Sequence, residues 1–200
     1  MWIGILISKY IFHRGRTTLK VSTVSLLALI FVYDTLAVHD YHNEVTDQIV
    51  INAPRDKVWK YVASHPVNSS NPDYWLFKVG LPQPIRSTVT GDTIGSKRKC
   101  IFSNGAVFDE VVVEYIPNQR YTFDITKQPD DPEIIGHIEI LRGQFLLEEG
   151  PNNTTLLIGK SWYRLMVYPV WYYDVWAEDI TREIHLRVME HIKGLAENDI

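Results

Sequence analysis

The most constraining feature of this sequence is a series of short, strand-like runs that are joined by tight turns and followed by one long helix. Asn104-Gly105 separates two of the runs, and Asn-Gly is a strong signal for a hairpin turn. Links this short favour strands that pair antiparallel with their neighbours. The sequence therefore predicts an antiparallel meander. Its strands are expected at residues 85–90, 96–103, 106–116, 120–126, 137–147 and 154–162.

The helix that follows, residues 171–198, is expected to have one apolar face. Large apolar side chains recur there at every fourth position: Trp176, Ile180, Ile184, Val188 and Ile192. Such spacing places them on one side of an α-helix. A sheet accompanied by a single apolar-faced helix must bury that helix against one of its faces. We therefore expect a curved sheet around the helix, with room for a cavity between them.

One further strand and one short helix precede the meander. Residues 44–51 end in Ile49-Val50-Ile51 and are typical of a strand. Residues 54–65 open with Pro54, which is favourable in the first turn of a helix. The complete order is strand, short helix, six strands and long helix. It predicts an α+β fold with a curved antiparallel sheet of about seven strands.

This pattern resembles the START-like (SRPBCC) superfamily, which includes polyketide cyclases, lipid-transfer domains and the birch-pollen allergen fold. The stretch "IVINAPRDKVWKYV" looks like the opening of that fold, and the match extends over residues 44–198. The stretches "WLFKVGLPQP", "GSKRKCIFSNGAVFDEV", "RGQFLL" and "IHLRVMEHIKGLAE" are similar to bacterial polyketide cyclase/dehydrase-like proteins with a hydrophobic N-terminal segment. The resemblance implies a helix-grip fold with an internal hydrophobic cavity. It supplies no catalytic residues.

The N-terminal part of the chain has the pattern of a membrane anchor. Residues 21–38 are mainly apolar, and this length approaches the roughly 20 residues that a helical span requires. Basic residues precede the segment and acidic residues follow it, which by the positive-inside rule keeps the N-terminus cytoplasmic. We predict an anchor and linker at residues 1–43 and an extracytoplasmic domain at residues 44–200. A signal peptide cleaved near Thr35-Leu36-Ala37 and a buried helix of a soluble protein are the alternatives.

Charge and cysteine content exclude several classes of function. The net charge is −4, and because residues 1–40 carry +2, the remaining chain carries −6. We therefore expect no binding to nucleic acid, which requires a basic face. The lone Cys100 excludes a disulfide framework and a cysteine-rich zinc site. The acidic and histidine side chains of residues 39–44 are interpreted as a solvated linker, so we expect no metal and no cofactor.

Charged residues within apolar strand faces are candidates for contacts with a ligand. By two-residue alternation, Arg98 shares a face with Cys100 and Phe102, while Glu110 and Arg142 share faces with other apolar residues. A buried charge needs a partner, so we predict that Glu110 pairs with Arg98 or with Arg142. The alternative is that these side chains project from the solvated side of the sheet.

Aromatic residues are dense where the last strand meets the last helix, in "SWYRLMVYPVWYYDVWAEDI". Trp162 and Tyr163 are expected to end the strand, while Tyr173 is expected to face the sheet and Trp176 to flank that face. His185 falls at the edge of the helical apolar stripe, and His191 falls nearer its centre. The complete set of predicted ligand-binding residues is Trp75, Arg98, Phe102, Glu110, Arg142, Trp162, Tyr163, Tyr173, Trp176 and His185.

Three functions are consistent with these patterns. The leading prediction is a membrane-anchored domain that binds a hydrophobic ligand, such as a lipid or a polyketide-like molecule, in its cavity. The second is a cyclase- or dehydratase-type enzyme that uses His185, Glu110 or Arg142, since the sequence reveals no serine or cysteine nucleophile with a supporting carboxylate. The third is an envelope interaction domain with a packed interior.

Overall fold

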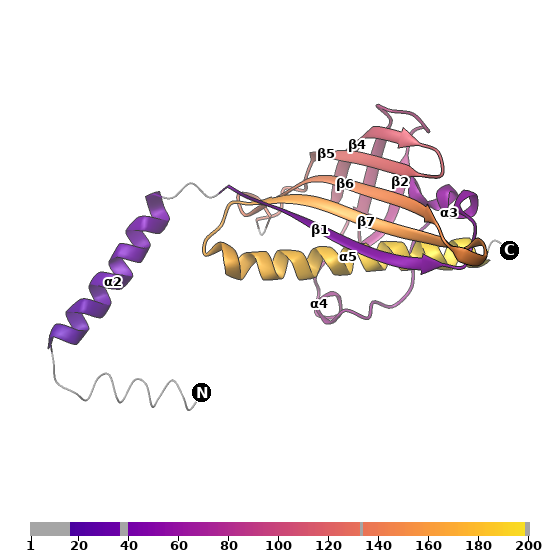
Figure 1. Ribbon diagram of the computed structural model, residues 1–200. Coiled ribbons are helices and arrows are strands. Elements are labelled where there is room, and N and C mark those ends of the chain that lie inside the picture. The colour runs from indigo at the N-terminus through magenta and orange to yellow at the C-terminus, as the bar shows by residue number, and fades with distance from the viewer. Residues whose placement is uncertain (1–16, 37–39, 133, 199–200) are drawn as a thin grey trace. The chain divides into compact units, whose positions relative to one another are not determined.

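The computed structural model describes residues 17–36, 40–132 and 134–198. The chain divides into two compact units, Met1–Val38 and His39–Ile200. The second unit contains a seven-stranded sheet that curls over one long helix (Figure 1). The first residues of the predicted anchor and linker, and residues 37–39, lie outside the described part of the chain.

Helix α2 (Thr17–Leu36) is the described element of the first unit. Its apolar side chains are exposed around the helix, with Leu29 at 67% and Phe31 at 68%. Among the helices of residues 17–36, 40–132 and 134–198, none combines the length and the hydropathy needed to cross a membrane.

Strands β2 to β7 form an antiparallel meander, and the first strand, β1, is added at its edge beside β7. The strand order is β1-β7-β6-β5-β4-β3-β2, so β1 lies beside β7 rather than beside β2. This arrangement confirms the predicted meander, including the hairpin at Asn104-Gly105, which joins β3 and β4. The strands are β1 (Tyr41–Ile51), β2 (Pro84–Val89), β3 (Lys97–Phe102), β4 (Val107–Ile116), β5 (Arg120–Lys127), β6 (Ile138–Glu149) and β7 (Thr155–Leu165).

The helices of this unit are α3 (Arg55–Val62), the single turn α4 (Trp75–Lys78) and α5 (Val170–Asn198), with a 3-10 turn η1 (Pro151–Asn153) before β7. Helix α5 runs along the concave side of the sheet (Figure 1). Two predictions were inexact. Strand β1 already begins within the predicted linker, and β7 continues past Trp162 and Tyr163 to Leu165.

The core consists of two apolar clusters that contact different parts of α5. The larger cluster surrounds Met189, Ile192 and Ala196 near the C-terminal end of the helix. The smaller one packs Ala177 against Val45, Tyr163 and Leu165 near its start. Between them the helix buries two polar side chains, Thr181 and His185.

The face that α5 turns toward the sheet differs from the predicted one. Its buried residues are Ala177, Thr181, His185, Met189, Ile192 and Ala196. This line runs one position away from the predicted stripe as far as Met189 and meets it at Ile192, while Trp176 is 39% exposed. The small side chains of Ala177 and Thr181 allow this part of the helix to approach the strands closely, which large aromatic side chains would prevent. Because Thr181 and His185 lie at its centre, the middle of the buried face is polar.

Candidate functional site

A cavity of about 120 Å³ lies between the sheet and the middle of α5. Aromatic and aliphatic side chains form most of its wall. They come from four strands and the helix, and they are Phe102, Phe108, Phe123, Ile125, Ile140, Phe145, Ile184 and Val188. Polar groups face the same space from β3, β4, β7 and α5. Apolar walls with a few convergent polar groups are characteristic of ligand sites.

Gly143 on β6 makes room for the ring of Phe123 on β5. A Cβ atom at this position would lie 2.5 Å from Cζ of Phe123. The ring of Phe123 therefore occupies the space that a side chain at residue 143 would need. The guanidinium of Arg98 stacks on the same ring, with Cζ of Arg98 4.4 Å from the ring centroid.

A buried ion pair between Arg98 and Glu110 forms one polar end of the cavity. The two residues face each other across β3 and β4, and their side chains are 3% and 4% exposed. Nε of Arg98 also donates to the carbonyl of Ala63 at 3.0 Å. Of the two predicted partners for Glu110, the structure selects Arg98.

Burial dominates the titration of this end of the cavity. Desolvation raises the pKa of Glu110, although the positive charge of Arg98 acts in the opposite direction. Desolvation alone lowers the pKa of Arg98, but Glu110 together with smaller contributions from neighbouring groups acts in the opposite direction, and the net pKa is raised. Burial also raises the pKa of the Cys100 thiol to about 12. Cys100 is therefore a neutral thiol at physiological pH and a poor nucleophile.

A second polar group is formed by Ser161, His185 and Asp47, which come from β7, α5 and β1. Nε2 of His185 lies 2.7 Å from Oγ of Ser161, and Nδ1 lies 2.8 Å from Oδ2 of Asp47. Both Ser161 and His185 line the cavity. A histidine held on one side by a carboxylate is fixed in orientation and tautomer, as a general base requires.

Gly159 on β7 leaves the space that the ring of His185 occupies. In the β1–β7 register it is opposite Asp47, and it precedes Ser161 by two residues on the same strand face. A Cβ atom at Gly159 would lie 3.7 Å from Cγ of His185 and 3.1 Å from Sδ of Met189. Because Gly159 has no side chain, the middle of α5, with His185, can pack closely against β7.

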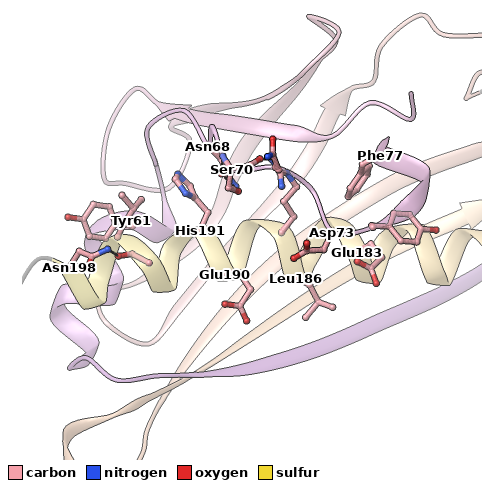
Figure 2. Close-up of a pocket in the computed structure, with 15 residues that line it drawn as sticks. Tyr61, Asn68, Ser70, Asp73, Phe77, Glu183, Leu186, Glu190, His191 and Asn198 are labelled. Atoms are coloured by element: carbon pink, nitrogen blue, oxygen red, sulfur yellow. Dashed lines mark hydrogen bonds between the residues drawn. The ribbon is translucent and has the colours of Figure 1, made fainter. Parts of the chain in front are cut away.

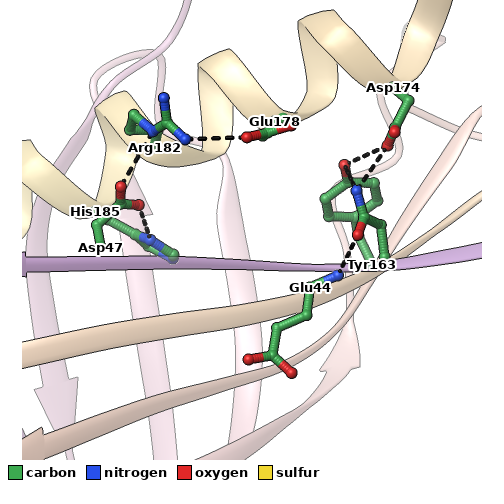
Figure 3. Close-up of polar contacts among 8 residues, drawn as sticks. Glu44, Asp47, Tyr163, Asp174, Glu178, Arg182 and His185 are labelled. Atoms are coloured by element: carbon green, nitrogen blue, oxygen red, sulfur yellow. Dashed lines mark hydrogen bonds and ion pairs between the residues drawn. The ribbon is translucent and has the colours of Figure 1, made fainter. Parts of the chain in front are cut away.

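A separate polar contact fixes the start of α5 to the same two strands (Figure 3). Oδ1 of Asp174 accepts hydrogen bonds from the Tyr163 hydroxyl at 2.6 Å and from the Asn43 side chain at 3.1 Å. Burial and the bond to Asp174 raise the pKa of Tyr163. These three residues do not belong to the cavity wall, and their contact is structural.

A larger groove of about 790 Å³ lies on the opposite side of α5, under the loop that leads to α4 (Figure 2). It is open, and two of its basic side chains bond to carbonyl oxygens of the loop. Arg187 donates to the carbonyl of Ser70, and Nε2 of His191 lies 3.1 Å from the carbonyl oxygen of Pro66. His191 therefore belongs to the outer groove and not to the buried face. We regard the smaller internal cavity as the site because, within the described part of the chain, a buried ion pair and a buried histidine–serine contact converge there.

The cavity brings together five of the predicted ligand-binding residues and leaves five elsewhere. Arg98, Phe102, Glu110 and His185 contribute to its lining, and Arg142 borders it, although its guanidinium bonds elsewhere. Tyr163 is buried in the smaller core cluster, and Trp162 is on the opposite strand face. The side chains of Trp75, Tyr173 and Trp176 are exposed on the surface.

Arg142 has a different orientation from the predicted one. Its guanidinium bonds to Asp124 on β5, and the side chain is 48% exposed. A break in strand register between Ile140 and Arg142 shifts the alternation, so that the residues after it exchange faces. Arg142 therefore pairs on the outer side of the sheet.

Asp47 and Ser161 were absent from the sequence prediction. Nothing in the sequence connects them with a histidine that is 138 and 24 residues away. The only available signal was that Asp47 and Ser161 occupy inward positions between apolar residues of their strands.

Comparison with solved structures finds this fold in proteins of low sequence identity. Norcoclaurine synthase from Thalictrum flavum, in complex with dopamine and hydroxybenzaldehyde, has a TM-score of 0.55 and 10% identity, over 81% of this chain and 90% of that chain. The aromatase/cyclase Zhui from a Streptomyces species has a TM-score of 0.54 and 11% identity, over 79% and 95%. A protein from Mesorhizobium loti has a TM-score of 0.52 and 16% identity, over 79% and 99%.

At these identities the likeness shows the fold alone, and it confirms the predicted helix-grip fold. No protein-family model matches the chain, and no curated protein matches it in sequence.

Proposed function

We propose that this helix-grip domain binds a small, mainly apolar molecule in the cavity between the sheet and α5. The observation that carries the proposal is the composition of the cavity wall. Apolar side chains surround a space into which a buried ion pair, Arg98–Glu110, and a histidine–serine pair face from different elements. Such polar groups orient a ligand that the apolar wall desolvates.

The size of the cavity restricts the ligand to about one ring. Its volume of about 120 Å³ is close to that of an engineered cavity of about 150 Å³ that binds benzene. Pockets for drug-sized ligands are larger, at about 300–1,000 Å³. A complete lipid or polyketide chain therefore exceeds this space, and a single-ring aromatic molecule fits it. Dopamine and hydroxybenzaldehyde, named with the norcoclaurine synthase structure, are single-ring molecules.

Calorimetric titration with 4-hydroxybenzaldehyde tests this proposal. We expect one binding site in the wild-type chain and its loss in Val188→Phe, which fills the cavity. Leu186→Phe is the matched control because Leu186 lies on the same helix but lines the outer groove. Binding that survives Val188→Phe and disappears in Leu186→Phe would transfer the site to the groove and refute the proposal.

An acid-base enzyme of the cyclase or dehydratase type is the second candidate function. The observation that favours it is the hydrogen bond between His185 and Asp47 at the cavity wall. Proton transfer to or from a bound ring needs a base that is fixed in orientation and within reach of the ligand. We expect His185→Gln to abolish solvent deuterium exchange at the acidic C–H positions of a bound ring ketone, while leaving its affinity within a few-fold.

We also propose that residues 21–38 attach the domain to a membrane as a single pass, with the N-terminus in the cytoplasm. Support comes from the apolar side chains that surround α2 and from the basic residues that precede it. Helices that are apolar on all sides are buried in a protein core or in a bilayer. The full chain should remain in the membrane fraction after alkaline carbonate washing, whereas residues 39–200 should be released. Release of both would refute the anchor.

A further inference from the structure

Three side chains from three elements form a continuous line of hydrogen bonds at the middle of α5. Ser161 contacts Nε2 of His185 at 2.7 Å, and Asp47 contacts Nδ1 at 2.8 Å. Figure 3 shows the contact between Asp47 and His185. The side chains of His185 and Asp47 are 8% and 10% exposed. A hydroxyl, a base and a group that orients the base are the three parts of an activated serine.

The carboxylate determines the direction of these hydrogen bonds. An ionised Asp47 can only accept, so Nδ1 of His185 carries a proton and the neutral ring offers its Nε2 lone pair to Ser161. The Ser161 hydroxyl then donates to His185, which is the arrangement in which the serine oxygen can attack. Asp47 is itself held by Arg182, whose Nε donates to Oδ1 at 3.1 Å.

A different contact already attaches the start of α5 to the same two strands. Asp174, near the start of α5, already binds the side chains of Asn43 on β1 and Tyr163 on β7. That contact uses no base. Ser161, by contrast, faces the cavity, and its neighbour on β6 is Gly143, which has no side chain. Ser161 therefore forms part of the cavity wall, on the side where a ligand would lie.

We infer that Ser161 is a nucleophile that accepts the acyl group of a small ester or thioester. The inference rests on the proposed function, because the substrate has to occupy the same one-ring cavity. Thr181 lies one helical turn before His185, is 7% exposed and lines the cavity. Its hydroxyl can donate a hydrogen bond to the carbonyl oxygen of the substrate.

The reaction is a two-step hydrolysis. Oγ of Ser161 forms a bond to the carbonyl carbon while its proton passes to Nε2 of His185. The bond to the alcohol or thiol then breaks, and the leaving group takes that proton. A water molecule next attacks the acyl-serine and gives a proton to His185. When the serine–acyl bond breaks, Ser161 regains the proton and a carboxylic acid is released. Ester and water thus give acid and alcohol, with no change in oxidation state.

Covalent labelling of the full chain with diisopropyl fluorophosphate tests the inference. We expect one adduct per chain, which peptide mapping by mass spectrometry places on Ser161. Ser87 is the internal control because it is also buried, but its Oγ accepts a hydrogen bond from the backbone N–H of His65, which cannot act as a base. Ser161→Ala should remove the adduct. Asp47→Asn should slow hydrolysis of 4-nitrophenyl acetate by about a hundredfold or more, because the amide favours the wrong histidine tautomer.

The outcomes separate this inference from the proposed function. Binding of 4-hydroxybenzaldehyde without any adduct on Ser161 would overturn the nucleophile and leave the binding proposal intact. An adduct that maps to another residue, or equal labelling of Ser161→Ala, would overturn the nucleophile as well. Absence of both binding and labelling would overturn both proposals. If Ser161→Ala does not fold, two other results test the nucleophile. The peptide map of the wild-type chain must place the adduct on Ser161, and His185→Gln must lose the labelling.

Discussion

At the scale of single residues, the most demanding contact is the buried pair of Arg98 and Glu110. Each charge has left water almost completely, and each is tolerated only because the other is present. The stacking of Arg98 on Phe123 and its bond to the Ala63 carbonyl complete its surroundings. The pair therefore constrains the shape of the cavity as well as its polarity.

Removing one charge of this pair should be strongly destabilising. Glu110→Gln leaves the Arg98 charge buried without its counter-ion, and we expect the free energy of unfolding to fall by about 3–5 kcal/mol. Chemical denaturation followed by circular dichroism measures this. Glu114→Gln, which alters a 35% exposed carboxylate of the same strand that pairs with Arg120, should cost at most about 1 kcal/mol. Equal costs in the two variants would show that the Arg98–Glu110 pair is not effectively buried.

A second prediction at the scale of single residues concerns His65, which is 4% exposed. Burial, assisted by the charges of Arg98 and His191, lowers its pKa from 6.5 to about 4, although a bond to the Pro66 carbonyl acts in the opposite direction. Between these pH values the unfolded chain binds more protons at this position than the folded chain. Stability contributed by neutral His65 is therefore complete above pH 6.5 and is lost as the pH falls toward 4.

The pH dependence of unfolding tests this prediction. Between pH 7 and pH 4 the wild-type chain should lose roughly 3 kcal/mol more stability than His65→Gln. His42→Gln, at a side chain that is 56% exposed, should follow the wild type. Parallel curves for the wild type and His65→Gln would contradict the assignment.

Single residues differ in how far the sequence could predict their roles. Arg98 and Glu110 could be found because charges are conspicuous in apolar strands with regular alternation. The same alternation rule gave a wrong prediction for Arg142, because a local break in register places its side chain on the other face of the sheet. Asp47 and Ser161 could not be connected with His185, since their proximity depends on how three elements pack and not on any spacing along the chain.

At the scale of elements, the contact between α5 and the sheet determines the site. Large apolar residues at every fourth position predicted the existence of the helix correctly, but the buried line starts at Ala177 and meets the predicted stripe only at Ile192. Close packing of a helix on a sheet needs a small residue on one side of the contact, and Gly159 on β7 leaves room there for His185 and Met189. The periodicity shows that a helix is amphipathic, but it does not reveal which of two adjacent lines touches the strands.

The glycine on β6 allows an element-scale prediction. Gly143→Ala places a methyl group within the ring of Phe123, and we expect a loss of about 1–3 kcal/mol in the free energy of unfolding from overpacking. Gly194→Ala is the matched control, because a methyl group added there would meet open space, with no neighbouring atom within 4 Å. In α5 that change should be neutral or should stabilise by up to about 1 kcal/mol. A Gly143→Ala chain as stable as the wild type would show that Phe123 moves freely.

At the scale of the whole molecule, short links between strands predicted the meander and the long helix, and the structure confirms both. Turn residues act locally, so the sequence reveals them directly. The cavity has no such signal, because its volume depends on side chains from five strands and a helix that meet only after folding.

The central claim is that a single-ring ligand occupies the space between the sheet and α5, beside His185. A crystal structure of the chain soaked with 4-hydroxybenzaldehyde tests this most directly. The account predicts electron density for one ring between Phe123 and Ile184, with its polar substituents near Arg98 or His185. Density only in the outer groove beside Tyr61 and His191, with an unchanged internal cavity, would contradict it.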